Sequence, residues 1–272
     1  DNELIKFAAK CDGIIAGTEN YSRPVLERLP HLKVISRLGV GLDNIDLDIV
    51  KNLGIKIYKT HTSPALSVAE LTVGLMIDVI RKLSGHYNDL VSGIWKKQMG
   101  NLISGKTLGI IGLGTIGKSL VRLVSGFNFN ILAYDLKHDK KFQKEHNITY
   151  CDLDVLLQEA DIVSIHLNLS DQNKNLISKE QLDLMKPEAI LINTSRGEIL
   201  YEKELYDTLR HGKILGAGLD VFTQEPYSGP LTELDNVVLT PHIGSYAKEI
   251  RMQMEIEAAE NLVRGLNYEY NK

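Results

Sequence analysis

The hydrophobic positions of this chain fall into short runs that alternate with segments of helical periodicity. Near the start, such runs occupy residues 13–17, 32–36 and 55–58. Unbroken apolar runs of this length are typical of strands buried on both faces, as in a parallel sheet whose strands are joined by helices. The first part of the chain is therefore expected to form a small parallel α/β domain.

A second series of apolar runs begins after a long helical pattern that extends from Ser63 to about Leu83. Its members are residues 107–111, 130–134, 161–165, 189–193, 216–220 and 237–240. Helical segments separate them, which predicts a doubly wound parallel sheet of six strands. An amphipathic helix from about Tyr246 to Arg264 follows, and we expect it to return to the first domain.

The pattern predicts an α/β protein of two domains. One is discontinuous and comprises residues 1–77 and 246–272, and the other comprises residues 78–245. The glycine-punctuated stretch around Trp95 is expected to connect them. Because residue 1 is Asp and the first residues read as the middle of a helix, we also expect the N-terminal part of the first domain to be missing from this sequence.

Composition and charge exclude several classes of protein. The 272 residues are 43% hydrophobic and carry a net charge of −4 without a basic block, so nucleic-acid binding is not expected. The apolar stretch at residues 71–80 is short and contains Asp78, so no membrane span is expected. Cys11 and Cys151 have no partner spacing, which excludes a disulfide framework or zinc ribbon. We expect a cytoplasmic protein without a metal site.

Residues 112–117 read Gly-Leu-Gly-Thr-Ile-Gly, which matches G-x-G-x-x-G between a predicted strand and a predicted helix. The glycines permit a tight turn, a close approach of a pyrophosphate and close packing of the helix on the strand. Asp135 ends the next strand, where a carboxylate binds ribose hydroxyls and repels a 2′-phosphate. The motif therefore predicts NAD rather than NADP, although Lys137 and His138 weaken that preference slightly.

Three residues with distinct chemistry follow three different predicted strands: Arg196, Glu225 and His242. Ligands bind beyond the carboxyl ends of strands in such sheets, so all three can point into one cleft. An arginine holds a carboxylate, a histidine exchanges a proton with a hydroxyl, and a carboxylate behind the histidine stabilises its protonated form. With a nicotinamide they would transfer a hydride to or from a 2-hydroxy acid. Singly, His242 could be structural and Glu225 part of a turn.

These segments resemble the NAD-dependent D-2-hydroxyacid dehydrogenases, a family that includes D-3-phosphoglycerate dehydrogenase. The resemblance runs from about residue 1 to residue 265. It rests on the glycine loop and on residues 193–197, 219–222, 225–226 and 240–244. It implies a Rossmann-type NAD-binding domain, a smaller flavodoxin-like substrate-binding domain and an active site in the cleft between them. It also implies a homodimer built on the nucleotide domains and the loop around Trp95.

The resemblance assigns roles residue by residue. It makes His242 the acid in reduction and the base in oxidation, Glu225 the residue that tunes it, and Arg196 the group that binds the substrate carboxylate. The cofactor-binding positions predicted from the motif and the resemblance are Gly112, Gly114, Thr115, Ile116, Gly117, Asp135, His166, Thr194, Asp220 and Gly244. The substrate-binding positions that it implies are Arg37, Leu38, Gly39 and Val40.

The sequence is less specific about which 2-hydroxy acid is the substrate. Arg37 resembles the phosphoglycerate branch, which favours 3-phosphoglycerate or a similar anionic 2-hydroxy acid and a place in serine biosynthesis, although Arg37 could instead form a surface salt bridge. The sequence departs from the family where Asn168 replaces a proline and Tyr201 an acidic residue. Two alternatives stay open, namely a hydroxypyruvate or glyoxylate reductase and a non-catalytic NAD(H)-sensing protein of the corepressor kind.

Overall fold

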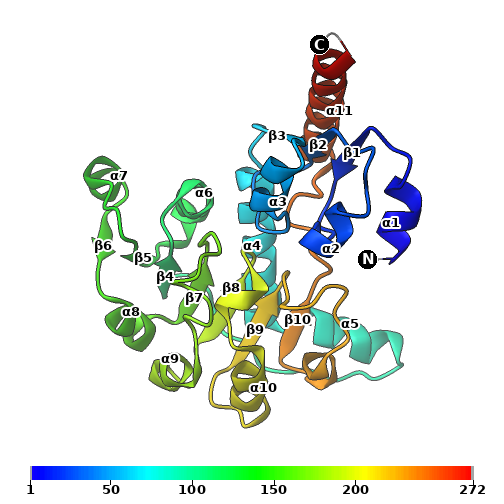
Figure 1. Cartoon of the computed structure of the whole chain (residues 1–272). Coiled ribbons are helices and arrows are strands. Elements are labelled where there is room, and N and C mark those ends of the chain that lie inside the picture. Colours follow the sequence, from blue (N-terminus) through cyan, green and yellow to red (C-terminus); the bar gives the residue numbers. More distant parts are fainter. Residues whose placement is uncertain (1, 271–272) are drawn as a thin grey trace. The chain divides into compact units, whose positions relative to one another are not determined.

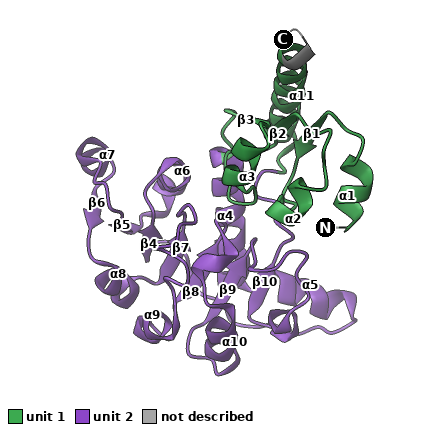
Figure 2. Ribbon diagram, in the orientation of Figure 1, with its two compact units in different colours: residues 1–64, 246–272 green, residues 65–245 purple. Residues whose placement is uncertain are grey.

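A computed structural model describes residues 2–270, which divide into two compact units (Figures 1 and 2). Unit 1 is formed by residues 1–64 and 246–272, and unit 2 by residues 65–245. The first boundary lies before helix α4 (Ala65–Arg81), not at the expected residues 77 and 78, because α4 packs on the sheet of unit 2. The stretch around Trp95, expected to connect the domains, lies wholly within unit 2.

Unit 1 is a three-stranded parallel sheet with helices on both faces. Its elements are α1 (Asn2–Ala8), β1 (Gly13–Ala16), α2 (Arg23–Leu26), β2 (Val34–Arg37), α3 (Leu47–Asn52), β3 (Lys56–Lys59) and α11 (Lys248–Tyr270). The strands pair in the order β1-β2-β3. Helix α11 packs across all three strands, and the short helices cover an apolar core that includes Val25, Leu26 and Ile49.

Unit 2 is built on a seven-stranded parallel sheet. Its strands are β4 (Thr107–Ile111), β5 (Asn130–Tyr134), β6 (Ile148–Tyr150), β7 (Ile162–Ile165), β8 (Ile190–Asn193), β9 (Gly216–Leu219) and β10 (Val237–Leu239). The order β10-β9-β8-β7-β4-β5-β6 reverses between β4 and β7, which makes the sheet doubly wound. The expectation of six strands was wrong by one, because β6 is only three residues long and pairs only with β5.

Helices cover both faces of this sheet. After α4 the helices of unit 2 are α5 (Leu83–Val91), α6 (Thr115–Leu123), α7 (Lys140–Glu145), α8 (Leu153–Glu159), α9 (Lys179–Leu184) and α10 (Glu202–Arg210), with 3-10 helices η1 (Val124–Phe127), η2 (Gly197–Ile199) and η3 (Pro230–Glu233). Helix α5 contacts α4 and has no buried residue. Helices α4 and α6 pack together on one face, and α8, α9 and α10 lie on the other (Figure 1). No helix within residues 2–270 has the length and apolar character that a bilayer span requires.

Alternate side chains of the central strands point into the two apolar cores of unit 2, one on each face of the sheet. Leu108 and Ile110 of β4 face the core under α4 and α6, whereas Ile111 belongs to the core under α8 and α9. Successive side chains of a strand point to opposite faces, so both sides of β4 are buried. Gly109 lets α8 approach, because an added Cβ would lie only 2.9 Å from the Cβ of Ala160. This packing fixes the strand ends from which the loops of the site emerge.

Candidate active site

The loops of the candidate site emerge at the carboxyl ends of the central strands of unit 2. The glycine loop follows β4, and His166 follows β7, the neighbouring strand on the other side of the reversal. The N–H of His166 donates to the Ile111 carbonyl at 2.8 Å, and the N–H of Gly112 donates to the Tyr134 carbonyl at 2.8 Å. Such a switch point is where open α/β sheets bind their ligands.

The glycine loop has the conformation that a dinucleotide site requires. Gly112 has φ +96°, and an added Cβ would lie 2.8 Å from the carbonyl oxygen of His166. An added Cβ on Gly117 would meet the Gly112 carbonyl, so helix α6 can approach the strand only because residue 117 is glycine. At Gly114 an added Cβ would meet nothing within 4 Å, and no side chain caps the start of α6. An open helix N-terminus with free space beside it suits a pyrophosphate.

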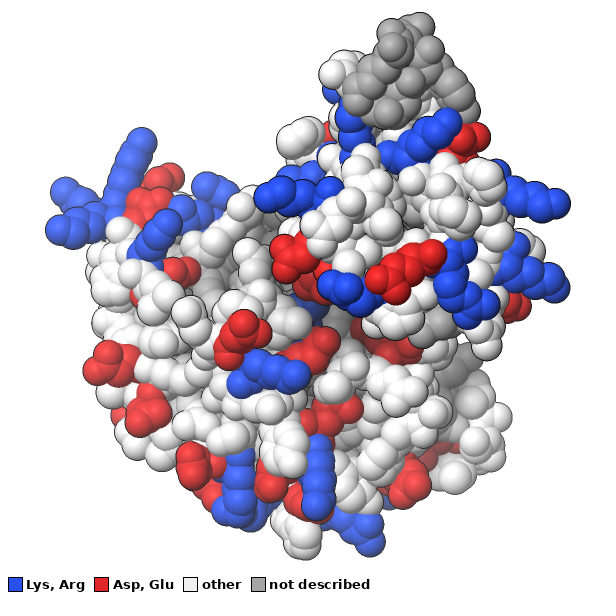
Figure 3. Space-filling model, in the orientation of Figure 1, with Lys and Arg blue, Asp and Glu red and all other residues white. Residues whose placement is uncertain are grey.

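Asp135 is positioned by the backbone at the end of β5. Its Oδ2 accepts the N–H of Leu113 in the glycine loop at 2.7 Å, and its Oδ1 accepts the N–H of Lys137 at 2.9 Å. A carboxylate can accept about four hydrogen bonds in total, so lone pairs remain for ribose hydroxyls. The ring of His138 stacks on Tyr150 at 4.0 Å, and basic side chains gather around α7 on the face shown in Figure 3.

His166 is a buried neutral histidine beside the glycine loop. Its Nε2 lies 2.9 Å from the hydroxyl of Ser164, which is itself fully buried. Burial lowers the pKa of His166 to about 4, because an imidazolium loses its hydration there. Its Nδ1 is buried without a hydrogen-bond partner among the residues that the structure describes. His166 therefore lies next to the cofactor loop without forming part of a proton relay.

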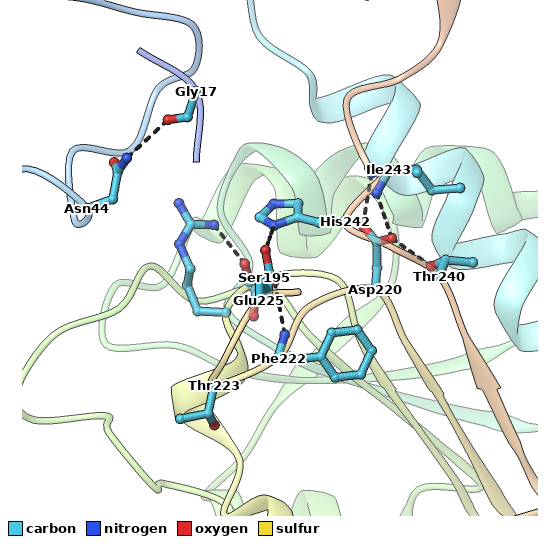
Figure 4. A network of polar contacts seen from close by, with 12 residues as sticks. Gly17, Asn44, Ser195, Asp220, Phe222, Thr223, Glu225, Thr240, His242 and Ile243 are labelled. Atoms are coloured by element: carbon cyan, nitrogen blue, oxygen red, sulfur yellow. Dashed lines mark hydrogen bonds and ion pairs between the residues drawn. The ribbon is translucent and has the colours of Figure 1, made fainter. Parts of the chain in front are cut away.

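His242 and Glu225 form the most direct polar contact of the site (Figure 4). The Nδ1 of His242 lies 2.7 Å from Oε2 of Glu225, and Oε1 of Glu225 accepts the N–H of Phe222 at 3.1 Å. Partial burial of Glu225 by itself raises the pKa of its carboxyl group. Hydrogen bonding and charge attraction from His242, the Phe222 N–H and the charge of Arg196 outweigh it, so the pKa lies below its ordinary value. Glu225 is thus an ionised partner that leaves Nε2 of His242 for another group.

Asp220 holds the loop that carries His242. Its Oδ1 accepts the hydroxyl of Thr240 at 2.6 Å and the N–H of Ile243 at 2.8 Å, and its Oδ2 accepts the N–H of Gly244 at 2.9 Å (Figure 4). Burial raises the pKa of Asp220, although these hydrogen bonds oppose the increase. His242 has φ +53°, a left-handed conformation that an L-residue adopts only when its surroundings impose it. The scaffolding role of Asp220 was not predicted from the sequence.

Arg196 lies in a loop shaped by the side chain of Asn193. The Oδ1 of Asn193 accepts the N–H of Ser195 at 3.0 Å, and its Nδ2 donates to the Arg196 carbonyl at 2.8 Å. The Arg196 guanidinium donates to the Ser195 carbonyl at 2.7 Å. Arg196 is also near enough to lower the pKa of Glu225, so the structure brings together all three residues that the sequence singled out.

Thr194, which was expected to contact the cofactor, is buried at the end of β8. Its hydroxyl lies 3.0 Å from the hydroxyl of Thr72 on α4, and Thr72 in turn donates to the carbonyl of Val68. The contact ties the Arg196 loop to α4. Among residues 2–270 no group of three or more His, Cys, Asp or Glu side chains is arranged to hold a metal ion.

The expected substrate loop, residues 37–40, lies in unit 1 after β2. Arg37 is only 7% exposed, and its Nη1 donates to the carbonyls of Ala16 and Leu38. Gly39 has φ +147°, and an added Cβ would lie 2.8 Å from that Nη1. The N–H of Gly39 donates to the hydroxyl of Thr60 at 3.1 Å, while Val40 is exposed. Arg37 therefore supports the loop from within.

The chain is similar in sequence to a known protein family and to enzymes of several organisms. Residues 73–244 match the family model described as D-isomer specific 2-hydroxyacid dehydrogenase, NAD binding domain. A hydroxypyruvate reductase of Thermotoga maritima is 37% identical over 97% of this chain and 88% of its own length. A glyoxylate reductase of Korarchaeum cryptofilum is 38% identical over 96% of this chain and 81% of its own length. A D-3-phosphoglycerate dehydrogenase of Methanocaldococcus jannaschii is 37% identical over 99% of this chain but only 55% of its own length.

A solved structure has the same fold. It is the D-lactate dehydrogenase of Aquifex aeolicus, determined in complex with NAD and lactic acid. It superposes with a TM-score of 0.83 at 29% sequence identity and covers 96% of this chain and 85% of its own length. The similarity thus extends over both units of the chain and includes the loops that carry Arg196, Glu225 and His242.

Proposed function

The chain belongs to the family of NAD-dependent D-2-hydroxyacid dehydrogenases, and we propose that it reduces a small 2-keto acid of the glyoxylate and hydroxypyruvate type. The observation that carries this proposal is the contact between His242 and Glu225, with Arg196 in the adjacent loop. A histidine hydrogen-bonded to a carboxylate and an arginine fork are the groups that a 2-keto acid needs for protonation and binding. The open helix N-terminus and Asp135 supply the corresponding groups for NADH.

His242 acts as the proton donor in reduction. Its Nδ1 faces the ionised Glu225, which assigns a proton to Nδ1 and stabilises the imidazolium. Its Nε2 can then donate to the oxygen of the C2 carbonyl as that oxygen gains charge. Bound NADH supplies the hydride to C2. In the reverse direction the same Nε2 accepts the proton of the hydroxyl group.

Arg196 orients the substrate. Its guanidinium offers several N–H donors in a rigid plane, which matches the two oxygens of a carboxylate. One donor is used on the Ser195 carbonyl, and this contact holds the planar group in a defined orientation. We propose that this guanidinium binds the substrate carboxylate and polarises the C2 carbonyl. In unit 1 the backbone N–H groups of Leu38 and Gly39 already donate to the Ala16 carbonyl and the Thr60 hydroxyl, so their surroundings give no support to a role in carboxylate binding.

A phosphate-binding role for Arg37 receives little support from its surroundings. The guanidinium is buried and donates to two backbone carbonyls of its own unit, so it supports the loop. Relatives named hydroxypyruvate reductase and glyoxylate reductase match over most of their own length. The relative named D-3-phosphoglycerate dehydrogenase keeps 3-phosphohydroxypyruvate as the second candidate substrate.

A steady-state assay of NADH oxidation tests the proposal. Glyoxylate, hydroxypyruvate, pyruvate and 3-phosphohydroxypyruvate are compared at equal concentrations. We expect kcat/KM for glyoxylate or hydroxypyruvate to exceed that for the phosphorylated acid by at least about tenfold, equivalent to about 1.4 kcal/mol. A preference for 3-phosphohydroxypyruvate would overturn the choice of substrate. Tight NADH binding without turnover of any of the four acids would instead favour an NAD(H)-sensing protein.

We also propose that residues 83–102 of unit 2 pack against a second copy of the chain. This segment exposes a dense set of large apolar side chains, including Trp95 at 83% and Met99 at 89% exposure. Others are Leu83, Tyr87, Leu90, Val91, Ile94 and Leu102. Many exposed large apolar side chains within one segment are typical of an interaction site, and closed two-fold dimers are the commonest assembly.

Sedimentation velocity tests the dimer. Trp95→Glu is expected to convert a dimer into a monomer at micromolar concentration, because it places a charge in the interface. Met252→Glu is the matched control, since Met252 is an exposed apolar residue of α11 in unit 1. A chain that sediments as a monomer before any substitution would contradict the proposal.

A further inference from the structure

The loop that carries Glu225 is held at a second point by another carboxylate, that of Glu202. Glu202 is the first residue of α10, and its side chain accepts the backbone N–H of Thr223. The preceding N–H, that of Phe222, donates to Oε1 of Glu225 at 3.1 Å. Two consecutive N–H groups of one backbone segment therefore bind two different carboxylates, one structural and one at the reacting histidine.

Gly197 fixes the same segment from the other side. An added Cβ on Gly197 would collide with the backbone of Phe222 and Thr223, so the Arg196 loop touches this segment without a side chain between them. Glu202 follows on the same stretch of chain, after η2. The positions of Arg196 and Glu225 are thus coupled through one contact at Gly197 and one hydrogen bond at Glu202.

We propose that Glu202 is a positioning residue for the reduction, which acts through Thr223 on Glu225 and through Glu225 on His242. The inference rests on the roles proposed above for Glu225 and His242. Without the Glu202 carboxylate, the Thr223 N–H donates a hydrogen bond to water instead. The backbone of residues 222–225 then becomes more mobile. The Glu225 carboxylate then spends less time at hydrogen-bond distance from Nδ1 of His242, and the attraction between the two charges falls with distance. Misplacement of a catalytic constellation by about 1 Å can cost about a hundredfold in rate.

Three variants separate this role from a general effect on α10. Glu202→Ala removes the acceptor, Glu202→Gln keeps an amide oxygen that can accept the Thr223 N–H, and Glu204→Ala is the matched control. Both glutamates lie in the first turn of α10, where a carboxylate interacts favourably with the helix dipole. We expect Glu202→Ala to lower kcat for keto-acid reduction about tenfold, less than the loss quoted for a full 1 Å misplacement. Glu202→Gln should restore most of kcat, and Glu204→Ala should leave it unchanged.

A pH profile and a double variant show whether Glu202 acts through Glu225. In Glu202→Ala the pH at which reduction is half-maximal should move to lower pH, in the same direction as in Glu225→Gln. Added to Glu225→Gln, the Glu202→Ala change should lower kcat by less than about twofold, because neighbours in one network are not additive. Full additivity, or an unchanged pH profile, would overturn the inference. If Glu225→Gln and His242→Asn themselves leave turnover intact, the proposed function fails instead.

Discussion

The Nδ1 atom of His242 lies 2.7 Å from Oε2 of Glu225, although the two residues reach this contact from loops that follow different strands, β10 and β9. The carboxylate is fixed by the Phe222 N–H, and the histidine is fixed by the hydrogen bonds of Asp220 to its loop. Nothing in this arrangement requires either residue to move before a proton is transferred from Nε2. Preorganisation of this kind is what makes a positioned acid effective.

Replacement of His242 tests its role as the proton donor. His242→Ala should abolish turnover, but His242→Asn is the sharper variant, because asparagine tolerates the left-handed backbone at φ +53°. We expect kcat to fall by about a hundredfold to ten-thousandfold, the usual contribution of a general acid. NADH affinity, measured by fluorescence titration, should change little. An equal loss of NADH binding and turnover would show that the residue is structural.

Glu225→Gln removes the charge but keeps an oxygen for the Phe222 N–H. Because the pKa of Glu225 is held below its ordinary value, the wild-type carboxylate is ionised throughout the neutral range. Its negative charge attracts the positive charge that develops on the neighbouring imidazole, and glutamine does not supply this attraction. We expect kcat for reduction to fall about tenfold at neutral pH and its pH profile to shift to lower pH. A profile that stays in place would contradict the pairing.

The preference for NADH over NADPH tests the position of Asp135. Asp135→Ala removes the carboxylate that would repel a 2′-phosphate, so the ratio of kcat/KM for NADPH to that for NADH should rise at least about tenfold. Lys137→Ala, which removes a cation from the same loop, should not raise this ratio. Because Asp135 also accepts the Leu113 N–H, some loss of activity with both cofactors is expected. An unchanged ratio would contradict the ribose assignment.

The buried His166 should make the stability of the protein depend on pH. Its folded pKa of about 4 lies below the ordinary value of 6.5, so the unfolded chain binds the proton more readily. The neutral imidazole is fully compatible with the fold above pH 6.5. As the pH falls from 6.5 to 4, the free energy of unfolding should therefore decrease by up to about 3 kcal/mol from this residue.

Urea unfolding of the wild type and of His166→Gln across this pH range checks the expectation. Glutamine places an amide group near the position of Nε2, where it can keep the contact with Ser164, but it cannot be protonated. The variant should lose less stability than the wild type between pH 6.5 and pH 4. If the free energy of unfolding decreases equally in the two proteins as the pH falls, His166 is not the group responsible.

The pattern of apolar runs was sufficient to locate most strands and the loops at their carboxyl ends. Strand β6 was missed because three residues at a sheet edge leave almost no periodic signal. The first boundary between the units was misplaced because the apolar face of α4 looks the same whichever sheet it packs on. Both errors concern tertiary packing, which a local pattern does not encode.

Within the site, the sequence identified the residues with suitable chemistry, but it did not show which groups they contact. Arg196, Glu225 and His242 stand out because their chemistry is complementary at three strand ends. The burial of Arg37 under its own loop was not predicted, because a guanidinium bound to backbone carbonyls has no sequence signature. The same applies to Asp220 and Glu202, whose partners are backbone N–H groups from distant loops.

The transfer of a labelled hydride tests the central claim most directly. The protein is mixed in excess with NADH deuterated at C4 of the nicotinamide and with hydroxypyruvate, and the product is analysed by mass spectrometry and chiral chromatography. We expect D-glycerate that carries deuterium at C2, formed by the wild type and at least about a hundredfold more slowly by His242→Asn when both are sampled at the same early times. Unlabelled product, the L-enantiomer, or equal conversion by the variant would contradict the proposed function.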